Sequence, residues 1–101
     1  MRTLTDDEFT EAVTSGNVLV EFGAAWCGPC RMLEPVLDEI DRERDDLTVV
    51  KVDMDASPRT ARDQGIMSAP TLQLYRDGRL VAQTVGARPK IHLNAWLEPH
   101  L

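Results

Sequence analysis

The chain has 101 residues, of which 43% are hydrophobic and 28% charged, and its formal net charge is −6 at pH 7. This length supports one modest hydrophobic core, so we predict a single domain over residues 1–101. The excess of acidic residues argues against binding to nucleic acid or to an anionic membrane through bulk electrostatics.

The first residues carry no targeting signal. Residues 1–8 turn acidic at once and contain no apolar signal region. No stretch of the chain approaches the roughly 20 consecutive apolar residues that a membrane-spanning helix needs. We therefore expect a cytoplasmic protein with no membrane contact, although an exported protein whose leader has been removed has the same appearance.

The first helix and the first core strand have local signals. Thr5 and Glu8 fit a capping box, which predicts a helix that continues to about Ser15 and ends at Gly16. The apolar run 18–22 follows. It is nearly continuous rather than alternating, as expected for a strand that is buried on both faces.

The rest of the chain alternates between helical and extended patterns. Apolar spacing and turn residues predict a helix from the cysteines to about Asp46, a strand over 47–53, a helix from Ser57-Pro58 to about Gln64, strands over 71–75 and 80–85, and a helix from about Pro89. Asp77-Gly78 lies between the last two strands and indicates a hairpin.

This order of elements predicts the fold class. A strand–helix–strand unit implies parallel pairing, and the late hairpin adds antiparallel strands to the same sheet. We predict an α/β protein, a three-layer α/β/α sandwich around a mixed sheet of four to five strands.

The most informative residues are the two cysteines of the chain, Cys27 and Cys30. They stand where strand 18–22 hands over to a helix, a placement that indicates a dithiol redox centre. Unpaired N–H groups and the dipole at a helix N-terminus stabilise a thiolate. We predict that Cys27, at the mouth, is the nucleophile and that Cys30, one turn further in, resolves the mixed disulfide.

Two other interpretations of the cysteines fit the sequence less well. A permanent disulfide or an inert buried thiol is possible, but two cysteines are few for a disulfide scaffold of this length. A zinc site needs at least three protein ligands, and His92 and His100 have no ligand spacing with the cysteines. We therefore expect neither a metal nor another cofactor bound to the chain.

Trp26-Cys27-Gly28-Pro29-Cys30 after an apolar strand, with Ala69-Pro70-Thr71 about forty residues downstream, resembles the thioredoxins. The likeness runs from Leu4 to the end of the last helix. It implies the thioredoxin fold and a protein disulfide reductase, an electron carrier in cell redox homeostasis. It also implies disulfide-containing target proteins as partners, an NADPH-dependent thioredoxin reductase that restores the dithiol, and a monomer.

The resemblance also assigns a surface on which target proteins dock. Its residues are Trp26, Gly28, Pro29, Ala69, Pro70, Gly86 and Ala87. A cis peptide before Pro70 is expected to face the cysteines, so that the backbone of Ala69 pairs with an extended target segment. The plainer alternatives are that Pro70 simply begins a strand and that Gly86 is a turn glycine.

Glu21 is an acid inside an apolar strand, which is costly unless the carboxyl is paired or protonated. The thioredoxins usually have an aspartate here, buried beneath the second cysteine as its proton acceptor, with a lysine partner that Lys51 matches. This implies that Glu21 and Lys51 belong to the catalytic site. The alternatives are a purely structural Glu21–Lys51 ion pair, or a Glu21 that faces solvent.

Two departures from the family pattern carry their own predictions. Gly23 stands where the family often has a bulky tryptophan, so we expect a thinner wall behind the active site. Residues 2–4 are all that remains for the usual first edge strand, which we expect to be vestigial.

Two alternative functions keep the same fold. One is a disulfide oxidase or isomerase that works outside the cytosol. The other is a non-catalytic binding subunit.

Overall fold

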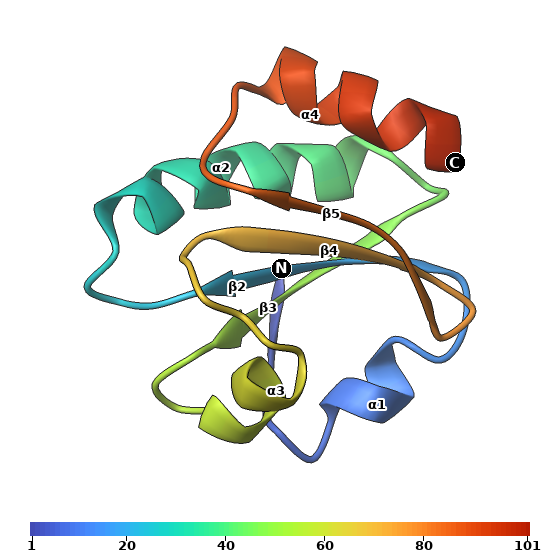
Figure 1. The fold of residues 1–101 in the computed structure, drawn as a ribbon. Coiled ribbons are helices and arrows are strands. Elements are labelled where there is room, and N and C mark those ends of the chain that lie inside the picture. The colour runs from blue at the N-terminus through green and yellow to red at the C-terminus, as the bar shows by residue number, and fades with distance from the viewer.

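A computed structural model describes all residues, 1–101, and contains five strands and four α-helices in one sandwich (Figure 1). The elements are β1 (Arg2–Leu4), α1 (Phe9–Ala12), β2 (Asn17–Gly23), α2 (Gly28–Glu43), β3 (Thr48–Asp53), α3 (Pro58–Asp63), β4 (Thr71–Arg76), β5 (Arg79–Val85) and α4 (Lys90–Leu97), followed by a 3-10 turn, Glu98–His100. None of these helices has the length and apolar character needed to cross a membrane.

The sheet is mixed, with the strand order β1-β3-β2-β4-β5. β1, β3 and β2 are parallel, because helical crossovers connect them, whereas β4 runs antiparallel to β2 and β5 antiparallel to β4. The two-residue hairpin between β4 and β5 has positive φ at Asp77 (49°) and Gly78 (84°), the conformation that matches the twist of the strands. The predicted mixed sheet is thereby confirmed with five strands.

Helices cover both faces of the sheet, so the three predicted layers are present. α2 and α4 lie on one face, and α1 and α3 lie on the other (Figure 1). β2 contributes side chains to the hydrophobic core on each face of the sheet. Leu19 packs with residues of α2 and α4, whereas Val18 and Val20 belong to the same cluster as Phe9 of α1. All three β2 residues are buried, which confirms the prediction of a strand covered on both faces.

β1 is as short as expected, but it is not vestigial in its packing. Its three residues pair in parallel with β3, with Leu4 opposite Val52. Leu4 is only 1% exposed and belongs to the same core cluster as Phe9 and Phe22. Burying a leucine side chain contributes about 2 kcal/mol, so this short strand anchors the edge of the sheet.

α1 is shorter than the helix predicted from Thr5 to about Ser15. Glu8 Oε1 accepts hydrogen bonds from both the backbone N–H (2.9 Å) and the hydroxyl (3.0 Å) of Thr5. These bonds form the return half of a capping box, but they close residues 5–8 as a turn rather than as the first turn of a helix. The helix therefore begins only at Phe9 and ends at Ala12, so Gly16, with φ of +74°, is not the residue that ends it.

α3 begins at Pro58 after Ser57, as predicted, but its cap comes from elsewhere in the chain. The side chain of Ser57 makes no capping hydrogen bond. Instead, Asp6 Oδ1 accepts the N–H of Thr60 at 2.7 Å and its hydroxyl at 2.6 Å, and Asp6 Oδ2 accepts the N–H of Arg59 at 3.3 Å. Hydrogen bonds of the Asp6 carboxylate thereby connect the segment before α1 to the start of α3.

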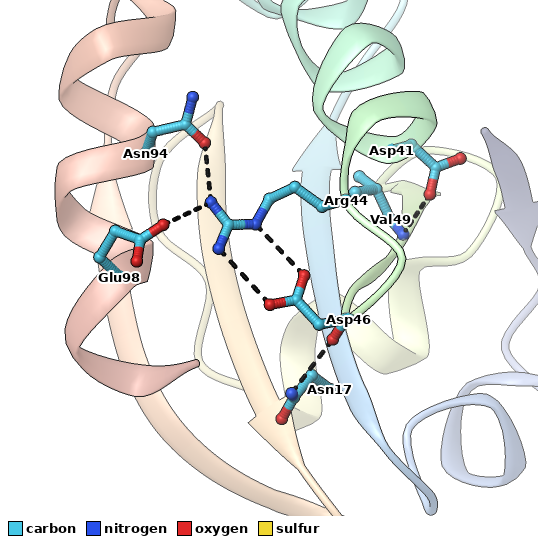
Figure 2. A network of polar contacts seen from close by, with 7 residues as sticks. All are labelled: Asn17, Asp41, Arg44, Asp46, Val49, Asn94 and Glu98. Atoms are coloured by element: carbon cyan, nitrogen blue, oxygen red, sulfur yellow. Dashed lines mark hydrogen bonds and ion pairs between the residues drawn. The ribbon is translucent and has the colours of Figure 1, made fainter.

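α2 ends at Glu43, three residues before the predicted end, because Arg44 leaves the helical region and turns its side chain toward α4 (Figure 2). Its guanidinium donates to Asn94 Oδ1 at 3.3 Å, pairs with Glu98 at 2.8 Å, and reaches Asp46 at 3.3 Å. The Arg44 side chain is 18% exposed, so this network ties the ends of α2 and α4 together in a partly buried setting.

Candidate active site

The two cysteines lie at the junction between the central strand β2 and helix α2. Cys27 is the N-cap of α2, with extended backbone angles, and Cys30 lies in the first turn. The residues form a disulfide with their Cα atoms 5.3 Å apart. Cys27 is 4% and Cys30 3% exposed, so burial alone does not distinguish a nucleophile from a resolving cysteine.

The N-terminus of α2 directs a backbone N–H, which carries a positive partial charge, at the sulfur of Cys27. The backbone N–H of Cys30 donates to Cys27 Sγ at 3.2 Å. Pro29, in the first turn, has no N–H of its own and fixes the backbone there. A thiolate at this N-cap is stabilised by the donated N–H and by the helix dipole, which is the electrostatic setting of a reactive cysteine.

The loop before β4 faces the dithiol. The Ala69–Pro70 peptide bond is cis, as the family resemblance implied. Ala69 O lies 3.7 Å from Cys27 Sγ, and Pro70 O accepts the N–H of Gly86 at 2.9 Å. Gly86 has φ of +98°, a conformation that favours glycine. The structure thus brings the 69–70 and 86 segments, far apart in sequence, together beside Cys27.

The Trp26 side chain is 69% exposed and is not part of the hydrophobic core. Its indole Nε1–H donates to Asp55 Oδ2 at 2.9 Å, so the ring is held although it is in solvent. Pro29 and Ala87 are exposed as well. The sequence gives no signal for this contact, because Asp55 lies between the predicted strand 47–53 and the helix that begins at Ser57-Pro58.

Glu21 lies beneath the dithiol and is 1% exposed. Its Oε2 atom is buried without a hydrogen-bond partner. Gly23 stands between the two groups: a Cβ built on this glycine would lie 3.3 Å from both Cys30 Sγ and Glu21 Oε2. The sulfur and the carboxylate therefore face the same small space, which any larger residue at position 23 would fill.

Burial raises the pKa of Glu21 to about 7, with a further rise caused by the negative charge of Glu34 and an opposing effect of Lys51. A carboxyl that exchanges its proton near neutral pH is suited to general acid–base chemistry with a thiol. The interpretation of Glu21 as a solvent-facing residue is excluded by its burial.

Lys51 lies directly opposite Glu21 in the register of β3 and β2. Its Nζ, however, bonds to Glu34 Oε1 of α2 at 2.6 Å, and it makes no ion pair with Glu21. The alternative of a structural Glu21–Lys51 ion pair is thus wrong, because the carboxylate of Glu34 on α2 binds the ammonium group instead. Sequence reasoning missed Glu34, whose one signal was its position four residues after Cys30, on the same side of the helix.

These groups line a cavity of about 380 Å³ between α2 and the sheet. Its lining residues are Thr3, Glu21, Gly23, Ala24, Ala25, Cys30, Arg31, Glu34, Lys51, Val52 and Asp53. The cavity passes Gly23, where the sequence predicted a thin wall behind the active site. It connects the buried carboxyl of Glu21 with Glu34 and Lys51, whose side chains are about one-third exposed (34% and 32%).

Two cysteines at a helix N-terminus that close into a disulfide are suited to the two-electron exchange of that disulfide with another. The protein is a thiol–disulfide oxidoreductase.

Comparison with known proteins agrees with this class. The sequence model of the Thioredoxin family matches residues 1–99. The chain is 45% identical to a thioredoxin of Bacillus subtilis, covering 96% of this chain and 94% of that protein. It is 50% identical to a thioredoxin of Alicyclobacillus acidocaldarius (94% and 92% covered) and 52% identical to one of Mycobacterium tuberculosis (89% and 80% covered). The chain belongs to the thioredoxin family, and its partners in general are disulfide-containing targets and reductases.

Proposed function

We propose that this protein reduces disulfides in target proteins by a two-step exchange at Cys27 and Cys30. The Cys27 thiolate attacks one sulfur of the target disulfide, that bond breaks, and the leaving target thiolate takes up a proton. Cys30 then loses its proton and attacks Cys27 Sγ, which releases the second target thiolate and leaves the Cys27–Cys30 disulfide. The observation that carries this order is the hydrogen bond from Cys30 N–H to Cys27 Sγ.

Glu21 is the proposed proton acceptor for Cys30. Its carboxyl and the Cys30 sulfur face the same point above Gly23, and its pKa of about 7 leaves it partly ionised at neutral pH. Lys51 acts on Glu21 through its positive charge rather than through a direct bond.

The proposed docking surface surrounds Cys27. Trp26, Gly28 and Pro29 belong to it as neighbours of Cys27 in the chain, and Ala69, Pro70, Gly86 and Ala87 belong to it from the segments before β4 and after β5. The carbonyl of Ala69, 3.7 Å from Cys27 Sγ, is placed to pair with the backbone of an extended target segment. Gly86 presents no side chain, and a Cβ there would contact nothing within 4 Å, so a target backbone has room to approach.

The further parts of the proposal follow from the family. An NADPH-dependent thioredoxin reductase restores the dithiol, so that no cofactor binds this chain. The protein works in the cytoplasm as a monomer, and its single domain spans residues 1–101.

The reduction potential of the Cys27–Cys30 pair tests this function. The purified protein is equilibrated with dithiothreitol and with glutathione buffers, and Trp26 fluorescence reports the redox state. A potential well below that of glutathione supports a disulfide reductase, whereas an oxidising value supports the oxidase or isomerase alternative.

Two cysteine variants test the order of attack. Cys30→Ser should accumulate a stable mixed disulfide through Cys27, and Cys27→Ser should form none. Full biological function of Cys27→Ser would support a non-catalytic binding subunit instead.

A further inference from the structure

In the cavity beneath the dithiol, the ammonium group of Lys51 acts on two carboxylates, those of Glu21 and Glu34. Lys51 lies opposite Glu21 across the paired strands, yet its ammonium bonds to Glu34 at 2.6 Å. Glu21 Oε2 keeps no hydrogen-bond partner although it is buried. Lys51 therefore forms its ion pair with Glu34, although the strand register places it opposite Glu21.

Solvation explains why Lys51 binds the outer carboxylate. The side chains of Glu34 and Lys51 are 34% and 32% exposed, so both charges stay partly hydrated when they pair. A bond to Glu21, which is 1% exposed, would require the ammonium group to give up most of its water. Burying a charge costs several kcal/mol, which a single added ion pair often fails to offset.

Glu34 raises the pKa of Glu21 in two ways. Its negative charge opposes the ionisation of Glu21, and its bond to Lys51 holds the cation that would favour ionisation. The same bond raises the pKa of Lys51, so the lysine stays charged wherever Glu21 titrates. The charged or titratable groups that line the cavity with Glu21 are Cys30, Arg31 and Glu34 from α2, and Lys51 and Asp53 from β3.

We propose that Glu34 is a positioning residue of the resolving step, which holds Lys51 away from Glu21 and so sets the pH at which Glu21 accepts the proton of Cys30. This inference rests on the proposed roles of Glu21 and Cys30. The proton moves from Cys30 Sγ to Glu21 across the space above Gly23, and the new thiolate attacks Cys27 Sγ. The bond from Cys27 to the target breaks, and the target thiolate takes up a proton from solvent. Glu21 later releases its own proton through the cavity.

The first test measures Glu21 directly in the oxidised protein. The side-chain carboxyl of Glu21 is followed by ¹³C NMR between about pH 5 and pH 9, in the wild type, in Glu34→Gln and in Glu39→Gln. Glu39 lies on the same helix but is exposed and outside the cavity, so its substitution controls for the loss of one negative charge.

We expect the midpoint of Glu21 to fall by about one pH unit or more in Glu34→Gln and to stay in place in Glu39→Gln. An unchanged midpoint in Glu34→Gln, with the fold intact by circular dichroism, overturns the proposal. Because this measurement needs no target protein, it answers the question even if the protein is not a reductase.

The second test follows the resolving step itself. A mixed disulfide between Cys27 and a peptide thiol is formed at low pH, and the single-turnover release of the peptide is measured over the same pH range. The lower inflection of the rate profile should shift with the NMR midpoint in Glu34→Gln, and Glu34→Asp, which keeps the charge, should return it toward the wild type.

The outcomes separate the two ideas. A rate profile that does not move while the NMR midpoint moves overturns the role of Glu34 in the resolving step. If Glu21→Gln has the same profile as the wild type, the assignment of Glu21 as proton acceptor fails, and the role of Glu34 in the resolving step fails with it, whereas the NMR comparison still reports whether Glu34 governs Glu21.

Discussion

Removing the charge of Glu21 should stabilise the protein, by an amount that depends on pH. The pKa of this carboxyl rises from 4.5 to about 7 on folding, mainly because burial penalises the charged form. At about 1.4 kcal/mol per pKa unit, the ionised carboxylate costs the folded state about 3 kcal/mol. Glu21→Gln keeps the shape of the neutral acid and cannot ionise, so it avoids this cost.

The sign of the effect follows from proton binding. Between about pH 4.5 and pH 7, the folded state holds a proton on Glu21 that the unfolded state has lost, so stability falls as the pH rises through this window. We expect Glu21→Gln and the wild type to be equally stable near pH 4, and the variant to be more stable by about 3 kcal/mol near pH 8.

Urea unfolding of the oxidised proteins at a series of pH values measures this difference. With slopes of about 1–3 kcal/mol per molar urea, the midpoints should separate by roughly 1–3 M near pH 8. Glu11→Gln, which removes an exposed acid on α1, serves as the control and should stay within about 0.5 kcal/mol of the wild type throughout. A difference between Glu21→Gln and the wild type that does not change with pH would refute the reasoning.

Three further substitutions test contacts around the site. Asp55→Ala releases the indole of Trp26, and we expect the KM for a target disulfide to rise about threefold with kcat unchanged, as steady-state kinetics would show. Gly23→Ala places a Cβ 3.3 Å from Cys30 Sγ and Glu21 Oε2, which should destabilise the protein by about 1 kcal/mol in urea unfolding; a neutral effect would mean that the cavity absorbs the methyl group. Asp6→Ala removes the cap of α3 and should lower the Tm by a few degrees near neutral pH. Hydrogen bonds from Thr60 lower the pKa of Asp6, so this loss should shrink in acid, once Asp6 is protonated in the wild type; a loss that persists there would contradict the capping role.

Features set by neighbouring residues could be predicted from the sequence. Asp77-Gly78 specifies its hairpin and Pro58 its helix start, because each depends on local backbone angles. The redox pair belongs to this group as well, since Cys27 and Cys30 lie within one turn at a helix N-terminus. The length of α1 was overestimated because the capping-box pattern does not tell a helical turn from the isolated turn that Thr5 and Glu8 form.

Contacts between distant segments could not be predicted in the same way. Asp6 caps α3, Asp55 accepts a hydrogen bond from Trp26, and Glu34 forms an ion pair with Lys51. In each case the partners come from different parts of the chain. Hydrophobic periodicity indicates which face of an element is buried, but it does not indicate which of several nearby carboxylates forms an ion pair with a lysine. That choice depends on how deeply each carboxylate is buried, which the three-dimensional packing decides.

The position of the dithiol on β2 and α2 also determines how it can be reached. β2 is paired on both sides, and α2 is packed against it through Leu33, Leu37 and Ile40, each at most 1% exposed. Segments of this kind form the last cooperative unit to open in hydrogen exchange. In the reduced, folded protein, an alkylating reagent should therefore reach Cys30 through the cavity that Cys30 lines, and not by the opening of α2 or β2. On the proposed order of attack, electrons would enter and leave through Cys27, while β2 and the packed face of α2 stay in place.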